Sequence, residues 1–322
     1  MRSKIRNLFQ IILSNRVFSK LFSEKKKYGQ IFSRVRRFLL YFPWWNHFIV
    51  NWGELFLIFL NIKKSSNIYF KDGFVYKNCN KKNWHFLTYY FRYVWEHNFP
   101  LKNKNDKIAV QVDKYYIELE HDWEGVGLID EIFVRKEYGK FDYNDKIVMD
   151  IGGFIGCSAV YFVLEGAKKV LVFELIKEAF EILEENIRFN KLENKIKVFN
   201  QGISSKHEEK IMYITRYKSR SGVFNFHYDP IKLKEKRIVN LIPFNEVLKD
   251  PIDILKVDCE GCEYDIFENI MEYNLIDKIR EGVILEVHFV NEQRNPEYLK
   301  SLLKKIGFKK IYSDNQMIWA YK

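Results

Sequence analysis

The stretch Ile252-Asp-Ile-Leu-Lys-Val-Asp-Cys-Glu-Gly-Cys-Glu263 decides the fold of this chain. Its first half, Ile252–Val257, is a mostly apolar run of strand length, which is typical of a strand buried on both faces of a sheet. Its second half places three carboxylates, Asp258, Glu260 and Glu263, within six residues. Packing explains such a crowd of acids poorly, and in open α/β sheets ligands bind at the carboxyl ends of the strands. The stretch therefore predicts a central parallel strand that is followed by a functional loop.

The stretches on either side of this strand alternate between strand and helix patterns, which indicates a mostly parallel sheet covered on both faces. Near the C-terminus, Phe308–Tyr312 and Met317–Tyr321 are separated by only four residues, and so short a link forces antiparallel pairing. We therefore predict an α/β, Rossmann-like fold in which the parallel sheet ends in an antiparallel hairpin. The other strands expected in the sheet are Ile147–Ile151, Val170–Phe173, Ile196–Phe199 and Val283–Val287.

A glycine-rich turn follows the first of these strands. The turn Asp150-Ile-Gly-Gly-Phe-Ile-Gly156 has the spacing G-G-x-x-G, which differs from the G-x-G-x-x-G of dinucleotide-binding folds. Asp150 would repel a pyrophosphate, but it suits a ligand with positive charge, such as the amino group and sulfonium of S-adenosyl-L-methionine (AdoMet). Glu174 ends the second strand, where an acid can accept hydrogen bonds from two ribose hydroxyls. NAD-binding folds share that last feature, so Glu174 alone does not discriminate between the two cofactors.

In these motifs the chain resembles the class I AdoMet-dependent methyltransferases, and within them the FkbM family. The likeness extends over roughly Glu137 to Tyr321. It implies a seven-stranded sheet with a reversed final strand, AdoMet as the cofactor, and O-methylation, frequently of a hydroxyl on a sugar or other natural product. The motifs that match are Asp150–Gly156, Phe173-Glu174, Asn186 to Asn190, Gly202-Ile-Ser204, Ile254–Glu263 and Glu286-Val-His288.

The resemblance also assigns the cofactor half of the site. Two positions depart from the family pattern, because Phe154 stands where the family usually has Asn and Leu175 where it usually has Pro. The missing Asn removes a polar contact near the cofactor, so the local geometry is expected to differ while the fold is not. The residues implied to bind the cofactor are Asp150, Gly152, Gly153, Gly156, Glu174 and Gly202.

The acidic loop is the predicted acceptor half. Methyl transfer to a hydroxyl needs an acceptor oxygen in line with the methyl group, and usually a group that removes the proton. Asp258, beside the expected sulfonium, is predicted to orient or deprotonate the acceptor. His288 is a second candidate base because an ordinary histidine titrates near neutral pH. Glu260 completes the predicted catalytic set, either by binding sugar hydroxyls or by fixing the loop.

Three further residues are predicted to bind the substrate: Lys256, Glu263 and Glu286. Lys256 points the same way along its strand as Asp258, so it either pairs with an acid of the loop or contacts the acceptor. For Glu263 the alternative is a cap on the following helix, where negative charge is favourable. A Mg²⁺ ion held by Asp258, Glu260 and Glu286 is a further alternative, and no metal site is assigned.

Cys259-Glu-Gly-Cys262 has the C-x-x-C spacing of redox and zinc sites. No second C-x-x-C and no paired histidines accompany it, and the FkbM family usually has small apolar residues at these two positions. Cysteine behaves as a small apolar residue as well. We therefore interpret Cys259 and Cys262 as packing residues.

The formal charge of +11 is concentrated in one arm. Residues 1–37 contain eleven Lys or Arg and one acid, which leaves 42 basic and 41 acidic residues in the rest of the chain. A nucleic-acid-binding face would need its bases spread over the folded body. The arm instead suits a membrane surface or a partner. No secretory signal pattern is present, so a cytoplasmic location at the inner membrane surface is expected.

Phe38–Ile62 is the most hydrophobic stretch of the chain. We predict an amphipathic helix here, with His47, Asn51 and Glu54 on the polar face, lying in a membrane interface or packing against the catalytic domain. A true membrane span is disfavoured, because one central acid costs about 2.5–3.5 kcal/mol. The predicted domains are an arm with this helix at 1–65, a mixed α+β lid at 66–140 and a methyltransferase domain at 141–322.

The sequence thus predicts an AdoMet-dependent O-methyltransferase acting on a hydroxyl, of a glycan or another small molecule, with association at the membrane through residues 1–62. The first alternative is an NAD-binding oxidoreductase, against which the G-G-x-x-G spacing, Asp150 and the terminal hairpin argue. The second is an RNA-directed methyltransferase or RNA-binding protein, which the near-neutral body disfavours, so no nucleic-acid partner is expected.

Overall fold

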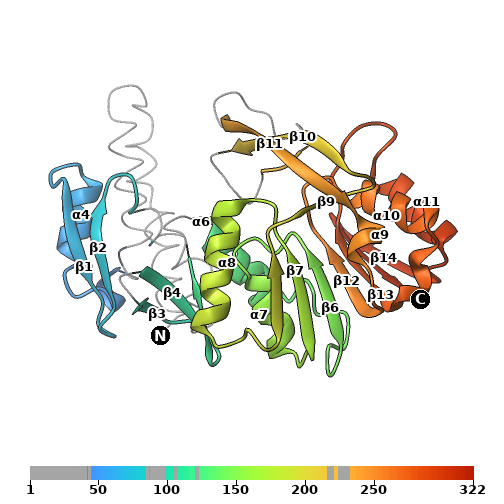
Figure 1. Cartoon of the computed structure of the whole chain (residues 1–322). Coiled ribbons are helices and arrows are strands. Elements are labelled where there is room, and N and C mark those ends of the chain that lie inside the picture. Colours follow the sequence, from blue (N-terminus) through green and yellow to red (C-terminus); the bar gives the residue numbers. More distant parts are fainter. Residues whose placement is uncertain are drawn as a thin grey trace, which may run out of the picture. The chain divides into compact units, whose positions relative to one another are not determined.

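The computed structural model describes residues 42, 45–84, 87, 99–104, 107–119, 123–215, 221–223 and 233–322 (Figure 1). It divides the chain into two units: residues 1–110 with 119–126, and residues 111–118 with 127–322. The second unit contains every residue of the predicted site.

A seven-stranded sheet forms the centre of the second unit, in the order β14-β15-β13-β12-β6-β7-β8. Its first five strands along the chain are parallel to one another, and β15 is antiparallel to both β13 and β14. The predicted Rossmann-like fold with a C-terminal antiparallel hairpin is confirmed. The strands are β6 (Ile147–Ile151), β7 (Lys169–Phe173), β8 (Ile196–Phe199), β12 (Ile252–Val257), β13 (Ile279–Glu286), β14 (Lys310–Asp314) and β15 (Met317–Tyr321).

Helices lie between these strands because parallel strands need crossover connections. All six residues of β12 are buried, as expected for a strand covered on both faces. The core around it combines residues of its neighbours β6 and β13 with residues of the helices that follow β12 and β13. The helices are α7 (Cys157–Leu164), α8 (Lys177–Phe189), α9 (Phe244–Val247), α10 (Glu263–Glu272) and α11 (Pro296–Ile306), with a π-helical turn at Asp130–Val134 and a 3₁₀ turn at Leu275–Lys278.

The strand order fixes where a ligand can bind. The chain leaves β6 toward β7 on one side, while β12 pairs with β6 on the other, so the order reverses between β6 and β12. Loops that follow two such strands diverge and leave a crevice at the carboxyl edge of the sheet. The glycine turn follows β6 and the acidic loop follows β12, so both lie at this switch point.

A second, smaller sheet of the same unit covers the start of α8. It consists of β9 (Gly202–Ser204), β10 (Glu208–Thr215) and β11 (Leu233–Pro243) in the order β10-β11-β9. Alternate residues of β10 and β11 are buried and form a small core with one residue of α8 and the N-cap residue of that helix. Its members are Ile176, Ala179, Met212, Ile214, Val239 and Leu241.

The first unit contains a hairpin that turns at Asp72-Gly73, formed by β1 (Ser65–Tyr69) and β2 (Val75–Asn80). It also contains β3 (Leu101–Lys104), which pairs with β4 (Lys107–Val112), a strand whose last two residues belong to the second unit. The next two elements along the chain after β4 are β5 (Tyr115–Glu118) and α6 (Trp123–Ile129).

The single helix predicted over Phe38–Ile62 is wrong for the described part of that stretch. Residues 45–48 are helical, but Ile49 forms a β-bridge with Phe70, and a separate helix, α4 (Trp52–Phe59), begins only after this break. The Asn51 side chain bonds the backbone of the hairpin at Asn67 and Tyr69, which diverts the chain from helix. Among the described residues no helix is long and apolar enough to cross a membrane.

The apolar side chains of this stretch are used for packing. Trp45, Ile49, Leu55 and Ile58 are buried within the first unit. The basic arm, residues 1–37, lies outside the described residues, so its predicted membrane contact stays a prediction.

Candidate active site

Gly152 joins the glycine turn to the acidic loop. Its φ is +83°, a conformation that side chains other than glycine rarely adopt, and a Cβ added there would lie 1.7 Å from the Asp258 carbonyl oxygen. The Asp258 N–H donates a hydrogen bond to the Ile151 carbonyl at 3.0 Å. The two loops are therefore in backbone contact, and only glycine fits between them.

The other predicted cofactor glycines surround the same turn. Gly156, with φ +93°, is the N-cap residue of α7. A Cβ on Gly153 would meet the Val172 side chain at 2.1 Å, and one on Gly202 would meet the Leu241 side chain at 2.4 Å. Internal packing therefore already requires these glycines, and their contact with a cofactor stays a prediction.

Glu174 lies at the end of β7, as predicted, and is buried. Its carboxylate accepts hydrogen bonds from the backbone N–H groups of Phe154 at 2.8 Å and Ile176 at 2.6 Å. Burial raises the pKa of Glu174 to about 7, against these two N–H groups, which lower it. Each carboxylate oxygen has further lone pairs, so the predicted ribose contact remains open to it.

Phe154 and Leu175, the two departures from the family pattern, have one structural explanation. Both pack against the small core between α8 and the β10–β11 hairpin. Phe154 adopts φ +45°, a region that Asn tolerates better than Phe. The chain has therefore exchanged the polar contact expected near the cofactor for apolar packing under the hairpin.

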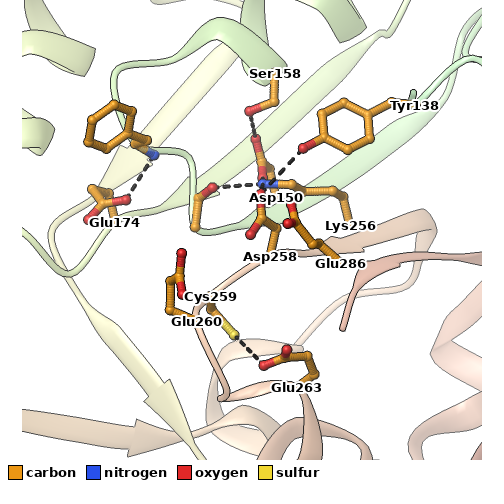
Figure 2. Close-up of polar contacts among 12 residues, drawn as sticks. Tyr138, Asp150, Ser158, Glu174, Lys256, Asp258, Cys259, Glu260, Glu263 and Glu286 are labelled. Carbon is orange, nitrogen blue, oxygen red and sulfur yellow. Dashed lines mark hydrogen bonds and ion pairs between the residues drawn. The ribbon is translucent and has the colours of Figure 1, made fainter. Parts of the chain in front are cut away.

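Asp150 and Lys256 form a buried ion pair beneath the turn (Figure 2). The Lys256 Nζ lies 2.9 Å from Asp150 Oδ1, and it donates a hydrogen bond to the Gly152 carbonyl at 2.7 Å. Ser158 donates to the other Asp150 oxygen at 2.6 Å. Burial lowers the pKa of Lys256, but Asp150 and Asp258 outweigh it and raise the pKa, so the ammonium stays charged. These contacts favour pairing over acceptor contact, the two roles predicted for Lys256.

Asp258 extends from the end of β12 toward the same group, with Oδ2 at 3.7 Å from the Lys256 Nζ. The Tyr138 hydroxyl donates a hydrogen bond to Asp258 Oδ2 at 3.4 Å, and the Lys256 ammonium lies 5.6 Å from the centre of the Tyr138 ring. Burial, followed by Asp258, raises the pKa of Tyr138, so its hydroxyl remains a donor. Sequence reasoning missed Tyr138, because 120 residues separate it from Asp258 and no motif marks it.

His288 occupies a buried position among carboxylates. Its Nδ1 lies 2.7 Å from Glu263 Oε1, and its Nε2 lies 3.5 Å from Glu260 and 4.0 Å from Glu286. Burial lowers the pKa of His288, but Glu263, Glu260 and Asp258 outweigh it and raise the pKa to about 10. The ring is therefore protonated at neutral pH and has no lone pair for a proton. A protonated ring weighs against the predicted general-base role of His288.

Glu263 is the first residue of α10 and is fully buried. Its Oε1 also accepts the backbone N–H of His288 at 2.9 Å. A carboxylate with no exposed surface favours the structural alternative over contact with an acceptor. Glu260, with φ +54°, and Glu286 keep partly exposed side chains at the edge of the site.

Cys259 and Cys262 are joined by a disulfide, so their interpretation as packing residues alone is wrong. The spacing of three residues allows the bond because the intervening Glu260 and Gly261 both turn with positive φ. Cys259 Sγ also lies 3.8 Å from Glu263 Oε2 (Figure 2). A disulfide sulfur has no proton to donate, so this is a contact and not a hydrogen bond.

The charge of the site is strongly negative. Arg135 pairs with Glu131 and Glu137. Burial is the main cause that raises the pKa of both acids, and Asp258 is among the neighbouring carboxylates that raise it further. Among the described residues named above, and leaving Glu174 aside, seven carboxylates lie with three cations at this edge of the sheet. No group of three or more side chains among the described residues could hold a metal ion, so the Mg²⁺ alternative finds no support. The carboxylates are Glu131, Glu137, Asp150, Asp258, Glu260, Glu263 and Glu286, and the cations are Arg135, Lys256 and His288.

The family model of the methyltransferase FkbM domain matches residues 150–310, half of the chain. The chain belongs to the FkbM methyltransferase family. The FkbM match begins at Asp150 and includes every site residue predicted from the sequence. Tyr138, Glu131 and Glu137 precede it, so no family motif could have drawn attention to them.

Other likenesses of this FkbM chain are partial. It is 42% identical over 50 residues to the uncharacterized protein 158B of Sulfolobus islandicus rod-shaped virus 1, a match that covers 16% of this chain and 32% of that protein. A putative RNA methyltransferase of Pyrococcus horikoshii is 15% identical, with 62% of this chain and 81% of that one covered and a TM-score of 0.36. A magnesium protoporphyrin IX methyltransferase of Synechocystis with bound SAM is 11% identical, with 60% and 77% covered and a TM-score of 0.35. Likenesses this weak say nothing about cofactor or substrate.

Proposed function

We propose that this chain is an AdoMet-dependent O-methyltransferase that methylates a hydroxyl of a glycan, sugar or other natural product. The observation that supports it is the excess of carboxylates at the switch point. Such a site favours a cationic ligand through Coulomb attraction in a partly desolvated environment. AdoMet carries a sulfonium, whereas the pyrophosphate of NAD and the phosphates of RNA would be repelled.

The residues present fit this cofactor. Residues 150–156, Glu174 and Gly202 would hold it, and when bound it supplies an electrophilic methyl group. Asp258 and Glu260 would orient the acceptor hydroxyl, since carboxylate oxygens accept its hydrogen bond and align its oxygen for in-line attack. A hydrogen bond from Tyr138 and the ammonium of Lys256 hold the Asp258 side chain in place.

Calorimetric titration with AdoMet and with NAD tests the cofactor. We expect saturable AdoMet binding and no NAD binding. Tight NAD binding without AdoMet binding would instead favour the oxidoreductase. Transfer of a labelled methyl group from AdoMet into glycan, lipid and RNA extracts of the source cells identifies the acceptor. We expect label in the glycan fraction. Label confined to RNA would contradict the proposal.

Asp258→Asn tests the acceptor half. The amide keeps the shape of the side chain but cannot take a proton, so turnover should fall by about 10²–10⁴-fold, the usual contribution of a general base. Asp250→Asn, at an exposed position, is the matched control and should keep full turnover. Full turnover in the Asp258 variant would show that another group handles the proton.

A further inference from the structure

Asp258 and Glu286 lie at the ends of neighbouring parallel strands. In the β12–β13 register Lys256 is opposite Ile284 and Val257 is opposite Leu285, so the next position brings Asp258 beside Glu286. Adjacent strands are about 4.8 Å apart, and side chains two residues apart point to the same face. Figure 2 shows the two carboxylates turned toward the same place, on the side of Lys256.

Among the described residues, each acid shares its nearest cation with a carboxylate that lies closer to that cation. The Lys256 ammonium lies closer to Asp150, at 2.9 Å, than to Asp258, at 3.7 Å. The His288 ring likewise lies closer to Glu263, at 2.7 Å, than to Glu286, at 4.0 Å.

The groups that face the pair from other elements mostly add negative charge. Glu260 approaches from the acidic loop and Glu131 from the π-helical turn, with Glu137 and Tyr138 just beyond that turn. Two like charges in this position cannot both ionise freely, so such a site retains a proton. The negative charge of Asp258 and, after it, burial raise the pKa of Glu286 to about 8. The nearby His288 lowers this pKa but does not outweigh them.

We propose that Asp258 and Glu286 act as one acid–base pair, which holds one proton in the free protein, releases it when the cationic cofactor binds, and then accepts the proton of the acceptor hydroxyl. The inference rests on the proposed function and deepens it. It makes Glu286 a catalytic residue, where the sequence predicted substrate binding, and it supplies a second base in place of the protonated His288.

The proton balance closes over one turnover. In the transfer step the acceptor oxygen forms a bond to the methyl carbon, and the carbon–sulfur bond breaks with both electrons left on sulfur. The hydroxyl proton passes to the Asp258–Glu286 pair, which regains its starting state as the neutral product S-adenosylhomocysteine leaves. The one proton that methylation liberates has thus already left the protein, when the cofactor bound.

The test is calorimetry of AdoMet binding to the full chain at pH 6.5, in two buffers of different ionisation enthalpy. At this pH the cofactor's α-amino group, with a usual pKa of about 7.7–8.0, stays protonated and does not interfere. The difference in heat between the buffers gives the protons released, and we expect about one per AdoMet. AdoMet affinity should correspondingly rise, by up to about tenfold per pH unit between pH 6 and 7.

Two comparisons make the test specific. Binding of S-adenosylhomocysteine, which has a neutral sulfur, should release far fewer protons than binding of AdoMet. This comparison needs no variant. Glu286→Gln should bind AdoMet with almost no proton release. Glu281→Gln is the matched control at the other end of β13, where the side chain pairs with Lys146 and is partly exposed, and it should behave like the parent.

The outcomes separate the two proposals. AdoMet binding with no proton release, equal release by both ligands, or undiminished release by Glu286→Gln would each overturn the acid–base pair and leave the methyltransferase proposal standing. No AdoMet binding at all would overturn the proposed function itself.

Discussion

Gly152 is the residue on which contact between the two halves of the site depends. Its Gly152→Ala variant should place a Cβ against the Asp258 carbonyl and strain a backbone at φ +83°. Together these effects should lower the free energy of unfolding by about 2 kcal/mol or more. Thermal or denaturant unfolding measures the loss.

Gly127→Ala is the matched control for this prediction. Gly127 lies in α6, and a Cβ there would meet nothing within 4 Å. Because alanine is the better helix former by roughly 0.5–1 kcal/mol, this variant should be as stable as the parent or more so. Equal stability of the two variants would show that the turn tolerates a side chain.

Residue identity and residue charge were not equally predictable. Asp258, Lys256 and His288 were placed at one edge of the sheet from the sequence, and the structure brings them together there. The protonation of His288 could not be foreseen, since it depends on Glu263 and Glu260 packing around the ring. A side chain's ionisation follows from its neighbours in space, which a motif does not specify.

At the scale of elements, α8 connects the glycine turn to β5. The Asn186 side chain accepts the Glu118 N–H at 2.7 Å and donates to the Ile155 carbonyl at 2.8 Å. One helical turn later, Asn190 bonds both backbone groups of Tyr116. The Asn186 to Asn190 motif, noted in the sequence only as part of the family likeness, thus docks a strand against the domain.

Asn186→Ala should therefore loosen β5 and the turn together. Removal of a buried side chain with several hydrogen bonds leaves unpaired backbone groups, at about 1–3 kcal/mol each. Hydrogen exchange should speed up in residues 111–118 and around Ile155. Asn190→Ala is the comparison, because it should release residues 111–118 but leave the turn near Ile155 protected. Unchanged exchange at Ile155 in the Asn186 variant would contradict the link.

Elements with a strong pattern were predictable, and one with a mixed pattern was not. The buried strands and the terminal hairpin appear where expected, because strand period, length and short links are local properties. The helix over Phe38–Ile62 failed because Asn51 forms its bonds with Asn67 and Tyr69. Those partners lie in a hairpin further along the chain, so the sequence pattern of residues 38–62 does not include them.

At the scale of the whole molecule, charge is divided between a basic arm and an acidic site. We assign the predicted membrane association to the arm, because Trp45, Leu55 and Ile58 of the hydrophobic stretch are buried in the first unit. Deletion of residues 1–37 removes eleven basic residues and keeps Trp45, Leu55 and Ile58 in the chain. Cosedimentation with anionic liposomes should then drop sharply.

Ionic strength and the lipid composition of the liposomes are the controls for membrane binding by the arm. Binding of the full chain should weaken as ionic strength rises and vanish on neutral liposomes, because basic residues near an anionic surface contribute about 1 kcal/mol each through screened attraction. Replacing Lys25, Lys26 and Lys27 by Gln should have an intermediate effect. Unchanged cosedimentation after the deletion would rule out the arm as the membrane contact.

The sequence by itself determined the Rossmann-like sheet with its reversed end, the FkbM membership, and the two loops that meet at the switch point. These follow from local periodicity, from glycine and acid spacing, and from the rule that parallel strands place their carboxyl ends together. Only the tertiary structure decided that Lys256 neutralises Asp150, that His288 is a cation, that Tyr138 joins the site, and that Asp258 and Glu286 are neighbours. The reason is that Coulomb interactions and desolvation depend on distances of a few ångströms between residues that the chain keeps far apart.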